Sequence, residues 1–481
     1  MLECDVFVIG CGPAGASLAL YLAQKKIKVI VAEKKKNLDI PVRCAGFVPV
    51  NIAGLFDFKI SGINNRTEFL ETYAAKNLSD KFHLITKTSA PGFILDRATF
   101  INDIALRFTA SGGNLFKGTK VNSILQNPGG FTLDLSDLAS KNHLAVKAKI
   151  ITGADGPLSL VGRHIGSSNK SLMPALLQNP EIILKNKDCN KVFLAPYISC
   201  GYGWLFPKTD SVNLGIGAFL GQKAMGTKNM AEKKLLDSEH HTCDRDSCSP
   251  GKDKDPCNYN TGRDTASTFI SIKDTLADFI RHLEFSGIFA GEINPQQPVF
   301  NNNAQAVTGL IPDSGIVENP GIKDGFILCG DAAGLCNPIT GAGIYNAVYS
   351  AKLASEIIAK ALSLNDLNIL QETKEIYNSH FGNSINRALR KKLMQKNNWP
   401  CSTPDIDDCT QVSADINGCP EQMPNIKNNW PKNEPSIKNN WPEHMQNAQS
   451  RSYFDYKDSK NNIEFLDLIR QTWISFKDYW H

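Results

Sequence analysis

The chain opens with a hydrophobic pattern that is typical of a nucleotide-binding βαβ unit. Residues 4–10 (CDVFVIG) form a mostly apolar run that ends in glycine, which favours a buried parallel strand. The sequence GCGPAG follows, and the apolar positions after it recur at helical spacing. A second apolar run, KVIVAE, ends at Glu33. The pattern therefore predicts a strand, a helix that begins near Ala14 and a second strand, with the glycines in the first turn.

The glycines and the acidic residue occupy positions that a dinucleotide requires. Gly10 allows a tight turn, Gly12 leaves room for a pyrophosphate beside the backbone, and Gly15 lets the helix pack closely on the strand. The helix N-terminus attracts phosphates. Glu33 follows Gly10 by roughly 20 residues, where an acid accepts the ribose hydroxyls. These residues predict dinucleotide binding without separating NAD from FAD.

Two later segments favour FAD. The first is an apolar strand that ends at Ile151 and leads into a sharp turn at Asp155. In the second, the apolar run 326–328 ends at Asp331, and the glycine-rich stretch 340–343 opens a long helix of small residues. An aspartate at this strand end can hold the ribityl hydroxyls, and the free N–H groups of the helix can stabilise the anionic reduced flavin. An NAD dehydrogenase needs neither feature, so FAD is the predicted cofactor.

Two further patterns each leave two interpretations open. Arg97 begins a predicted helix and is a candidate contact of the FAD phosphates or the ring edge, while a plain surface arginine is the alternative. Tyr202, Trp204 and Phe206 alternate, so their side chains share one face if the segment is a strand. That face suits an apolar substrate, but the spacing alone equally favours a sheet packed on its own core.

Composition and charge exclude several classes of protein. The chain has 52 Lys and Arg residues against 48 Asp and Glu, and the resulting net charge of +4 argues against nucleic-acid binding. A hydrophobic content of 42% supports a large core. No apolar run is long enough for a membrane-spanning helix, and no signal peptide is expected at the N-terminus. The thirteen cysteines are therefore expected to be reduced thiols in the cytoplasm.

Two polar stretches interrupt the periodic pattern and are predicted to be surface insertions. The first, 221–268, contains Cys243, Cys248 and Cys257 beside two histidines. Structural zinc sites show tighter pairs, so incidental thiols are the preferred interpretation and no metal site is predicted. The second, 396–450, contains the sequence KNNWP three times and is rich in Asn and Pro, which predicts loose order.

The motifs, taken in order, resemble those of the aromatic-hydroxylase superfamily of flavoproteins. The shared set is the glycine loop with Glu33, the LDR sequence that ends at Arg97, the GADG turn and GDAAG with GAGI. The segment 201–208, GYGWLFPK, resembles the YxWxFPK motif of the geranylgeranyl reductase family. The segment 43–49, RCAGFVP, is similar to that family's C-x-G-x-x-P motif, with Ala45 where glycine is common.

This resemblance implies an α/β fold with a discontinuous Rossmann-like FAD-binding domain, an inserted β-rich substrate domain and a C-terminal helical segment. The predicted limits are 1–49, 93–165 and 320–365 for the FAD-binding domain, 50–92 and 166–319 for the substrate domain, and 366–395 and 451–481 for the C-terminal helices. The predicted cofactor-binding residues are Gly10, Gly12, Ala14, Gly15, Glu33, Lys34, Cys44, Ala45, Arg97, Val121, Asp155, Asp331, Gly341, Gly343 and Ile344, and the predicted catalytic residues are Cys44, Tyr202 and Trp204.

The activity that the resemblance implies is saturation of isolated double bonds in a prenyl lipid, quinone or pigment side chain by reduced FAD. Such a reaction needs a positioned alkene and one proton. Cys44 is a candidate donor of that proton, or it packs under the ring, and Tyr202 is the second candidate. Trp204 is a candidate wall of the prenyl channel. NADPH and ferredoxin both stay open as the electron donor. The alternatives are a hydroxylase of the same superfamily and a non-catalytic prenyl-lipid binder.

The C-terminal segment is amphipathic. Its apolar stripe consists of Phe465, Leu466, Ile469, Trp473, Phe476 and Trp480. The stripe lacks a rich basic face, so closure of a core is the preferred prediction. Peripheral contact with a membrane surface, where a lipid substrate would enter, is the second interpretation.

Overall fold

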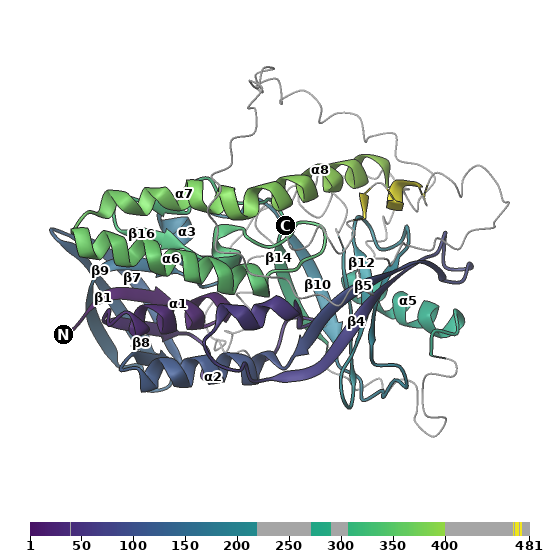
Figure 1. Ribbon diagram of the computed structural model, residues 1–481, viewed down its shortest axis with the longest axis horizontal. Helices are drawn as coiled ribbons and strands as arrows, with labels where there is room; N and C mark the ends of the chain where they lie inside the picture. The colour runs from purple at the N-terminus through teal and green to yellow at the C-terminus, as the bar shows by residue number, and fades with distance from the viewer. Residues whose placement is uncertain are drawn as a thin grey trace, which may run out of the picture.

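The computed structural model describes residues 1–38, 40–218, 271–289, 306–399, 465, 467–470 and 472–473. Most of the two predicted insertions lies outside the described residues, including the cysteine cluster and the second and third KNNWP copies. The described part of the chain forms two sheets, one toward each end of an elongated molecule (Figure 1).

The first sheet contains the N-terminal strand and is mainly parallel. Its central strands, in spatial order, are β15 (Gly321–Ile322), β16 (Phe326–Leu328), β9 (His143–Gly153), β1 (Leu2–Ile9), β2 (Val29–Glu33) and β6 (Asn114–Lys117). The hairpin of β7 (Thr119–Asn127) and β8 (Gly130–Asp137) joins β9 in antiparallel fashion. Three distant parts of the sequence thus build one sheet, as a discontinuous Rossmann-like unit requires.

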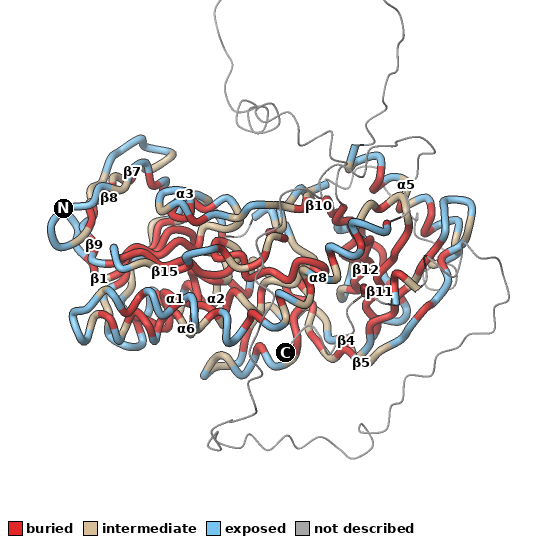
Figure 2. Tube along the Cα trace, turned by 90° about the horizontal axis from the view of Figure 1, so that it is seen from above, coloured by how far each residue is buried: buried red, intermediate tan, exposed pale blue. Residues whose placement is uncertain are grey.

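Alternation along β1 determines which layer each side chain joins. Val6 and Val8 pack against the helical layer, whereas Phe7 and Ile9 pack against the opposite layer. The helical layer consists of α1 (Pro13–Gln24), α2 (Arg97–Ala110) and α6 (Ile344–Leu364). The opposite layer includes the β7–β8 hairpin, α3 (Leu160–His164) and residues from α7 (Glu372–Tyr377) and α8 (Asn383–Asn398). Figure 2 shows the buried strands between these layers.

The second sheet has eight strands. In spatial order they are β14 (Val307–Pro312), β10 (Leu172–Gln178), β13 (Val212–Gly217), β12 (Tyr202–Pro207), β11 (Cys189–Leu194), β4 (Ile63–Ala74), β5 (His83–Leu95) and β3 (Phe47–Pro49). Helix α5 (Ile272–Phe285) covers one face with Leu276, Phe279 and Leu283. Strand β3 and the end of β5 belong to this sheet, although the predicted domain limits assign residues 47–49 and 93–95 to the FAD-binding domain.

Short helical turns complete the described chain. They are η1 (Val50–Leu55), η3 (Gly330–Ala333), η4 (Leu367–Gln371) and the π-helical segment η5 (Asn378–Gly382), which joins α7 to α8. Within the described ranges, no helix is both long and apolar enough to cross a membrane.

The C-terminal residues cover the other face of the second sheet. Phe465 and Ile469 are buried there and Trp473 is partly buried, which confirms the predicted closure of a core at these positions. Leu466, Phe476 and Trp480 lie outside the described residues. Trp399 packs in the same cluster, although the sequence pattern placed it in a loosely ordered insertion. Its ring packs against Phe465, and its Nε1 donates to the Pro196 carbonyl, so the first KNNWP copy is partly structural.

The predicted fold class is confirmed. The chain is an α/β protein with a discontinuous, mainly parallel first sheet, a second sheet built largely from the intervening sequence, and helices toward the C-terminus. The exact domain limits stay a prediction.

Candidate functional site: a dinucleotide cradle between the two sheets

The glycine loop between β1 and α1 has the shape of a phosphate cradle. Gly10 has φ +95°, and a Cβ there would lie 2.5 Å from the Ala154 carbonyl oxygen. A Cβ on Gly15 would lie 2.0 Å from the Gly10 carbonyl oxygen, so this glycine lets α1 approach the loop. At Gly12 a Cβ would meet nothing within 4 Å. The loop is therefore closely packed at two glycines and open at the one that would face a pyrophosphate.

Glu33 braces this loop from the end of β2. Its carboxylate accepts hydrogen bonds from the Cys11 N–H at 2.7 Å and from the Lys35 N–H at 2.8 Å. A carboxylate has about four lone-pair sites, so capacity for ribose hydroxyls remains. Lys34, the next predicted cofactor residue, is exposed beside it. Ala14 lies in the first turn of α1, 2.9 Å from where a Cβ on Gly330 would be.

Arg97, Asp331 and Gly343 come together from three separate elements. Burial raises the pKa of Asp331, and the positive charge of Arg97 partly offsets this effect. A Cβ on Gly343 would lie 3.1 Å from Asp331 Oδ1, so the carboxyl group lies against the start of α6. Among the described residues, no hydrogen-bond donor contacts the Asp331 carboxyl oxygens. A half-buried carboxylate at this position is suited to accept the hydroxyls of a ribityl chain.

Three predicted cofactor residues use their side chains within the protein. Asp155 accepts hydrogen bonds from Ser159 Oγ and from the Leu160 N–H, each at 2.6 Å, and thereby fixes the start of α3. Burial raises the pKa of Asp155, and these bonds partly offset the rise. Val121 and Ile344 are each 7% exposed and pack in the core. Contacts of these three residues with a cofactor stay a prediction and would be made by their backbone.

The loop that leads into α6, residues 337–343, is fixed from several sides. Asn337 Oδ1 accepts from the Ile339 and Thr340 N–H groups, both at 3.1 Å. The Tyr202 hydroxyl, on β12 of the second sheet, donates to the Thr340 carbonyl oxygen. Lys392 of α8 donates to the Pro338 carbonyl oxygen at 2.8 Å. The second sheet and the C-terminal helix therefore both hold the loop that presents Gly341 and Gly343.

Cys44 is connected to strand β12 through the buried side-chain amide of Asn213. Trp204 Nε1 donates to Asn213 Oδ1 at 2.7 Å, and Asn213 Nδ2 lies 3.4 Å from the Cys44 carbonyl oxygen. The Gly46 N–H points to Cys44 Sγ at 3.4 Å, and Ala45 packs partly buried against the aromatic cluster. The three predicted catalytic residues thus lie at the junction of the two sheets.

The aromatic alternation on β12 is confirmed, because Tyr202, Trp204 and Phe206 all pack in one cluster. The same cluster contains Trp399 and the buried C-terminal residues. This face is therefore a packed core face, as one of the two interpretations expected, and its role as the wall of a prenyl channel stays a prediction.

Sequence reasoning missed three residues that organise this site, namely Asn213, Thr340 and Lys392. No spacing rule identifies Asn213 or Thr340. Asn213 contacts Cys44 and Thr340 contacts Tyr202, and each pair is separated by more than 100 positions in the sequence. Lys392 could have been found. It shares a helical stripe with Ile385, Ala388 and Gln395, so its position predicts a lysine directed into the core.

The comparisons with known proteins agree with this geometry. Residues 3–190 match a family described as an FAD binding domain. The chain is 26% identical to digeranylgeranylglycerophospholipid reductase 1 of Methanosphaera stadtmanae, covering 75% of this chain and 76% of that one. It is 24% identical to the digeranylgeranylglycerophospholipid reductase of Methanocaldococcus jannaschii, covering 82% and 87%.

Solved structures share the fold. A geranylgeranyl bacteriochlorophyll reductase-like protein from Thermoplasma acidophilum superposes with a TM-score of 0.63 at 23% identity, covering 82% of this chain and 88% of that one. The flavin-dependent halogenase CmlS has a TM-score of 0.57 at 14% identity, covering 85% and 69%.

The fold, the glycine cradle and the FAD binding domain define this protein as an FAD-dependent oxidoreductase. FAD is its cofactor, as the two later motifs predicted. Its similarity to proteins named digeranylgeranylglycerophospholipid reductases agrees with the resemblance that the GYGWLFPK segment showed.

Proposed function

We propose that this protein saturates carbon–carbon double bonds in the prenyl chain of a lipid, quinone or pigment. The names of its relatives support reduction of geranylgeranylated lipids as the class of reaction. The observation that carries the proposal is the double attachment of β12. Trp204 is linked through Asn213 to the Cys44 loop, while Tyr202 holds the loop that presents Gly343. An aromatic, apolar face is thereby fixed beside the predicted flavin position.

The residues of the cradle fit FAD. Gly12 leaves space for the pyrophosphate, Glu33 would take the ribose, Asp331 the ribityl chain, and the α6 N-terminus the pyrimidine end of the ring. Bound and reduced FAD supplies the hydride for an alkene. The first-turn N–H groups of α6, which follow Gly343, would stabilise negative charge on the reduced ring.

An isolated alkene has no polar group that a protein can hold, so the chain must position it by shape. The buried face of Tyr202, Trp204 and Phe206 would hold a prenyl chain against apolar surface and exclude water. Because Trp473 packs against Tyr202, the proposal requires the C-terminal residues to move away from that face when the substrate binds. Placing one double bond correctly then lowers the activation barrier without the polar contacts that orient substrates in other enzymes.

Cys44 is the better candidate for the proton donor. The Tyr202 hydroxyl already donates its hydrogen to the Thr340 carbonyl oxygen, so it would have to break that bond to protonate a substrate. The Cys44 thiol is only half-buried and is held beside the β12 network by its backbone. We propose that it delivers the single proton that completes the reduction.

The test uses the purified holoenzyme without air. The flavin is reduced with dithionite, a digeranylgeranyl glycerophospholipid is added in detergent, and flavin reoxidation and lipid mass are followed together. We expect reoxidation with a gain of two hydrogens for each bond reduced. Cys44→Ser should slow reoxidation at least about tenfold, whereas Cys4→Ser, a buried thiol of the first sheet, should not.

Other outcomes would identify the alternatives. A product that gains oxygen, and only in air, would favour a hydroxylase. Lipid binding without any reoxidation would favour a non-catalytic binder. Comparing NADPH with reduced ferredoxin in the same assay identifies the electron donor. Sedimentation with anionic lipid vesicles tests peripheral contact with a membrane, which we propose as the route of a lipid substrate to the site.

A further inference from the structure

Helix α8 places a lysine in the protein interior beside the loop that leads into α6. Lys392 is 8% exposed and donates to Asp313 Oδ2 at 2.7 Å and to the Pro338 carbonyl oxygen at 2.8 Å. Asp313 follows the end of β14 and is 4% exposed. The ion pair therefore connects α8, the second sheet and the 337–343 loop at one point.

The environment of this pair is unfavourable for charge. Burial lowers the pKa of Lys392, and the charge and hydrogen bond of Asp313 counteract that effect. Within the described part of the chain, Asp313 Oδ1 is buried without a hydrogen-bond partner. Isolated buried ion pairs contribute little to stability compared with apolar residues of the same size. Stability alone is thus a weak reason for a lysine at this position.

The contact to Pro338 gives a stronger reason. Two residues further along, the Thr340 carbonyl is held by Tyr202, and the loop then presents Gly341 and Gly343. Gly343 directly precedes α6, so the loop that Lys392 contacts at Pro338 ends at the start of this helix.

We propose that Lys392, held by Asp313, is a positioning residue for FAD. It fixes the 337–343 loop so that the first-turn N–H groups of α6 meet the pyrimidine end of the flavin. These N–H groups stabilise the anionic reduced flavin more than the oxidised flavin, so the effect depends on how firmly the loop is held. The proposal rests on FAD binding and not on the identity of the substrate.

The decisive variant is Lys392→Met, which keeps the length of the side chain and removes its charge and hydrogen bonds. FAD affinity is measured by fluorescence, and the flavin midpoint potential by dye equilibration, both without any prenyl substrate. We expect oxidised FAD to bind about tenfold more weakly, and reduced FAD a further tenfold. For a two-electron couple, that further tenfold lowers the midpoint potential by about 30 mV. Lys392→Arg should restore most of the potential.

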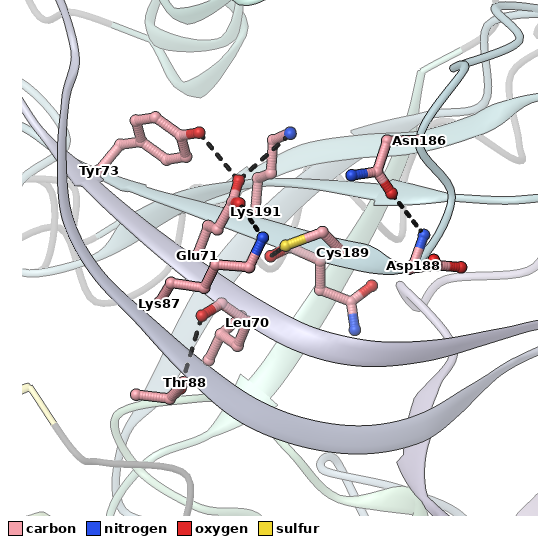
Figure 3. A network of polar contacts seen from close by, with 10 residues as sticks. Leu70, Glu71, Tyr73, Lys87, Thr88, Asn186, Asp188, Cys189 and Lys191 are labelled. Carbon is pink, nitrogen blue, oxygen red and sulfur yellow. Dashed lines mark hydrogen bonds and ion pairs between the residues drawn. The ribbon is translucent and has the colours of Figure 1, made fainter. Parts of the chain in front are cut away.

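The second sheet offers a matched control. Lys191 is 3% exposed and lies 3.3 Å from Glu71, which also accepts bonds from Tyr73 and Lys87 (Figure 3). Lys191→Met removes a buried lysine–carboxylate contact of the same kind, on a face that packs against α5. It should lower the urea midpoint of unfolding and leave the flavin potential at the wild-type value.

Lys392→Met leaves the Asp313 carboxylate buried, which could prevent folding. The double variant Lys392→Met, Asp313→Asn removes both charges, and it should fold and show the same fall in potential. Wild-type affinity and potential in either folded variant would overturn the proposal, and so would an equal shift in Lys191→Met. If the potential falls as expected while the wild-type enzyme reduces no prenyl lipid, the positioning role stands and only the proposed substrate class fails.

Discussion

Substitution of Gly12 separates cofactor binding from folding. The residue has φ −76° and ψ −168°, an extended backbone that any amino acid adopts, and a Cβ would meet nothing within 4 Å. Gly12→Val should therefore change the free energy of unfolding of the apoprotein by no more than about 0.5 kcal/mol. A small increase in this free energy of unfolding would also agree with the prediction, because replacing glycine reduces the entropy of the unfolded chain.

The same side chain should abolish stable FAD binding. In the open space at Gly12, a valine would occupy the volume that we assign to the pyrophosphate, and the phosphates would lose their approach to the α1 N-terminus. We expect affinity to fall at least about 100-fold, which corresponds to about 2.8 kcal/mol. The purified variant should be colourless.

Gly15→Ala is the contrasting variant. Its Cβ would lie 2.0 Å from the Gly10 carbonyl oxygen, and this oxygen belongs to backbone that cannot move away easily. Forcing such a contact costs about 1–3 kcal/mol or more in folding free energy. Both variants should lose FAD, but only Gly15→Ala should lower the urea midpoint of the apoprotein. Measurements of 450-nm flavin absorbance and of tryptophan fluorescence in urea distinguish them. A yellow Gly12→Val protein with wild-type affinity would refute the assignment of the cradle.

Two further predictions concern the second sheet. Trp204→Phe keeps the apolar ring but leaves Asn213 Oδ1 without its indole donor, which should cost about 1–3 kcal/mol in the unfolding of the holoenzyme; an unchanged urea midpoint would contradict this. For Glu71, burial raises the pKa, but the charges of Lys191 and Lys87 and the bond from Tyr73 outweigh burial and hold the pKa below its usual value. Its stabilisation is therefore complete above the unfolded pKa of about 4.3 and is lost as pH falls through the lower folded pKa. The difference in unfolding free energy between wild type and Glu71→Gln should accordingly be large at neutral pH and should disappear in that acidic range. A difference that does not depend on pH would show that the carboxylate is not stabilised by charge.

Much of the cradle could be predicted from the sequence because its determinants are local. The strand, the turn at Gly10, the helix at Pro13 and the acid at Glu33 follow one another along the chain, and each obeys a spacing rule. The helix after Gly343 was equally predictable, since a glycine-rich loop precedes it and small residues recur along it. Residue types needed for backbone conformation are thus visible without any tertiary information.

The contacts that join the two sheets were not predictable in the same way. Asn213 meets the Cys44 backbone across 169 positions, and Lys392 meets Asp313 across 79. Hydrophobic periodicity assigns a residue to a face, but it does not say which distant element packs against that face. A polar residue on an apolar stripe does indicate that a buried partner exists, because an unpaired charge in the core is too costly. Lys392 meets that condition, so its place on the α8 stripe could have indicated a buried partner, but only the fold identifies that partner as Asp313.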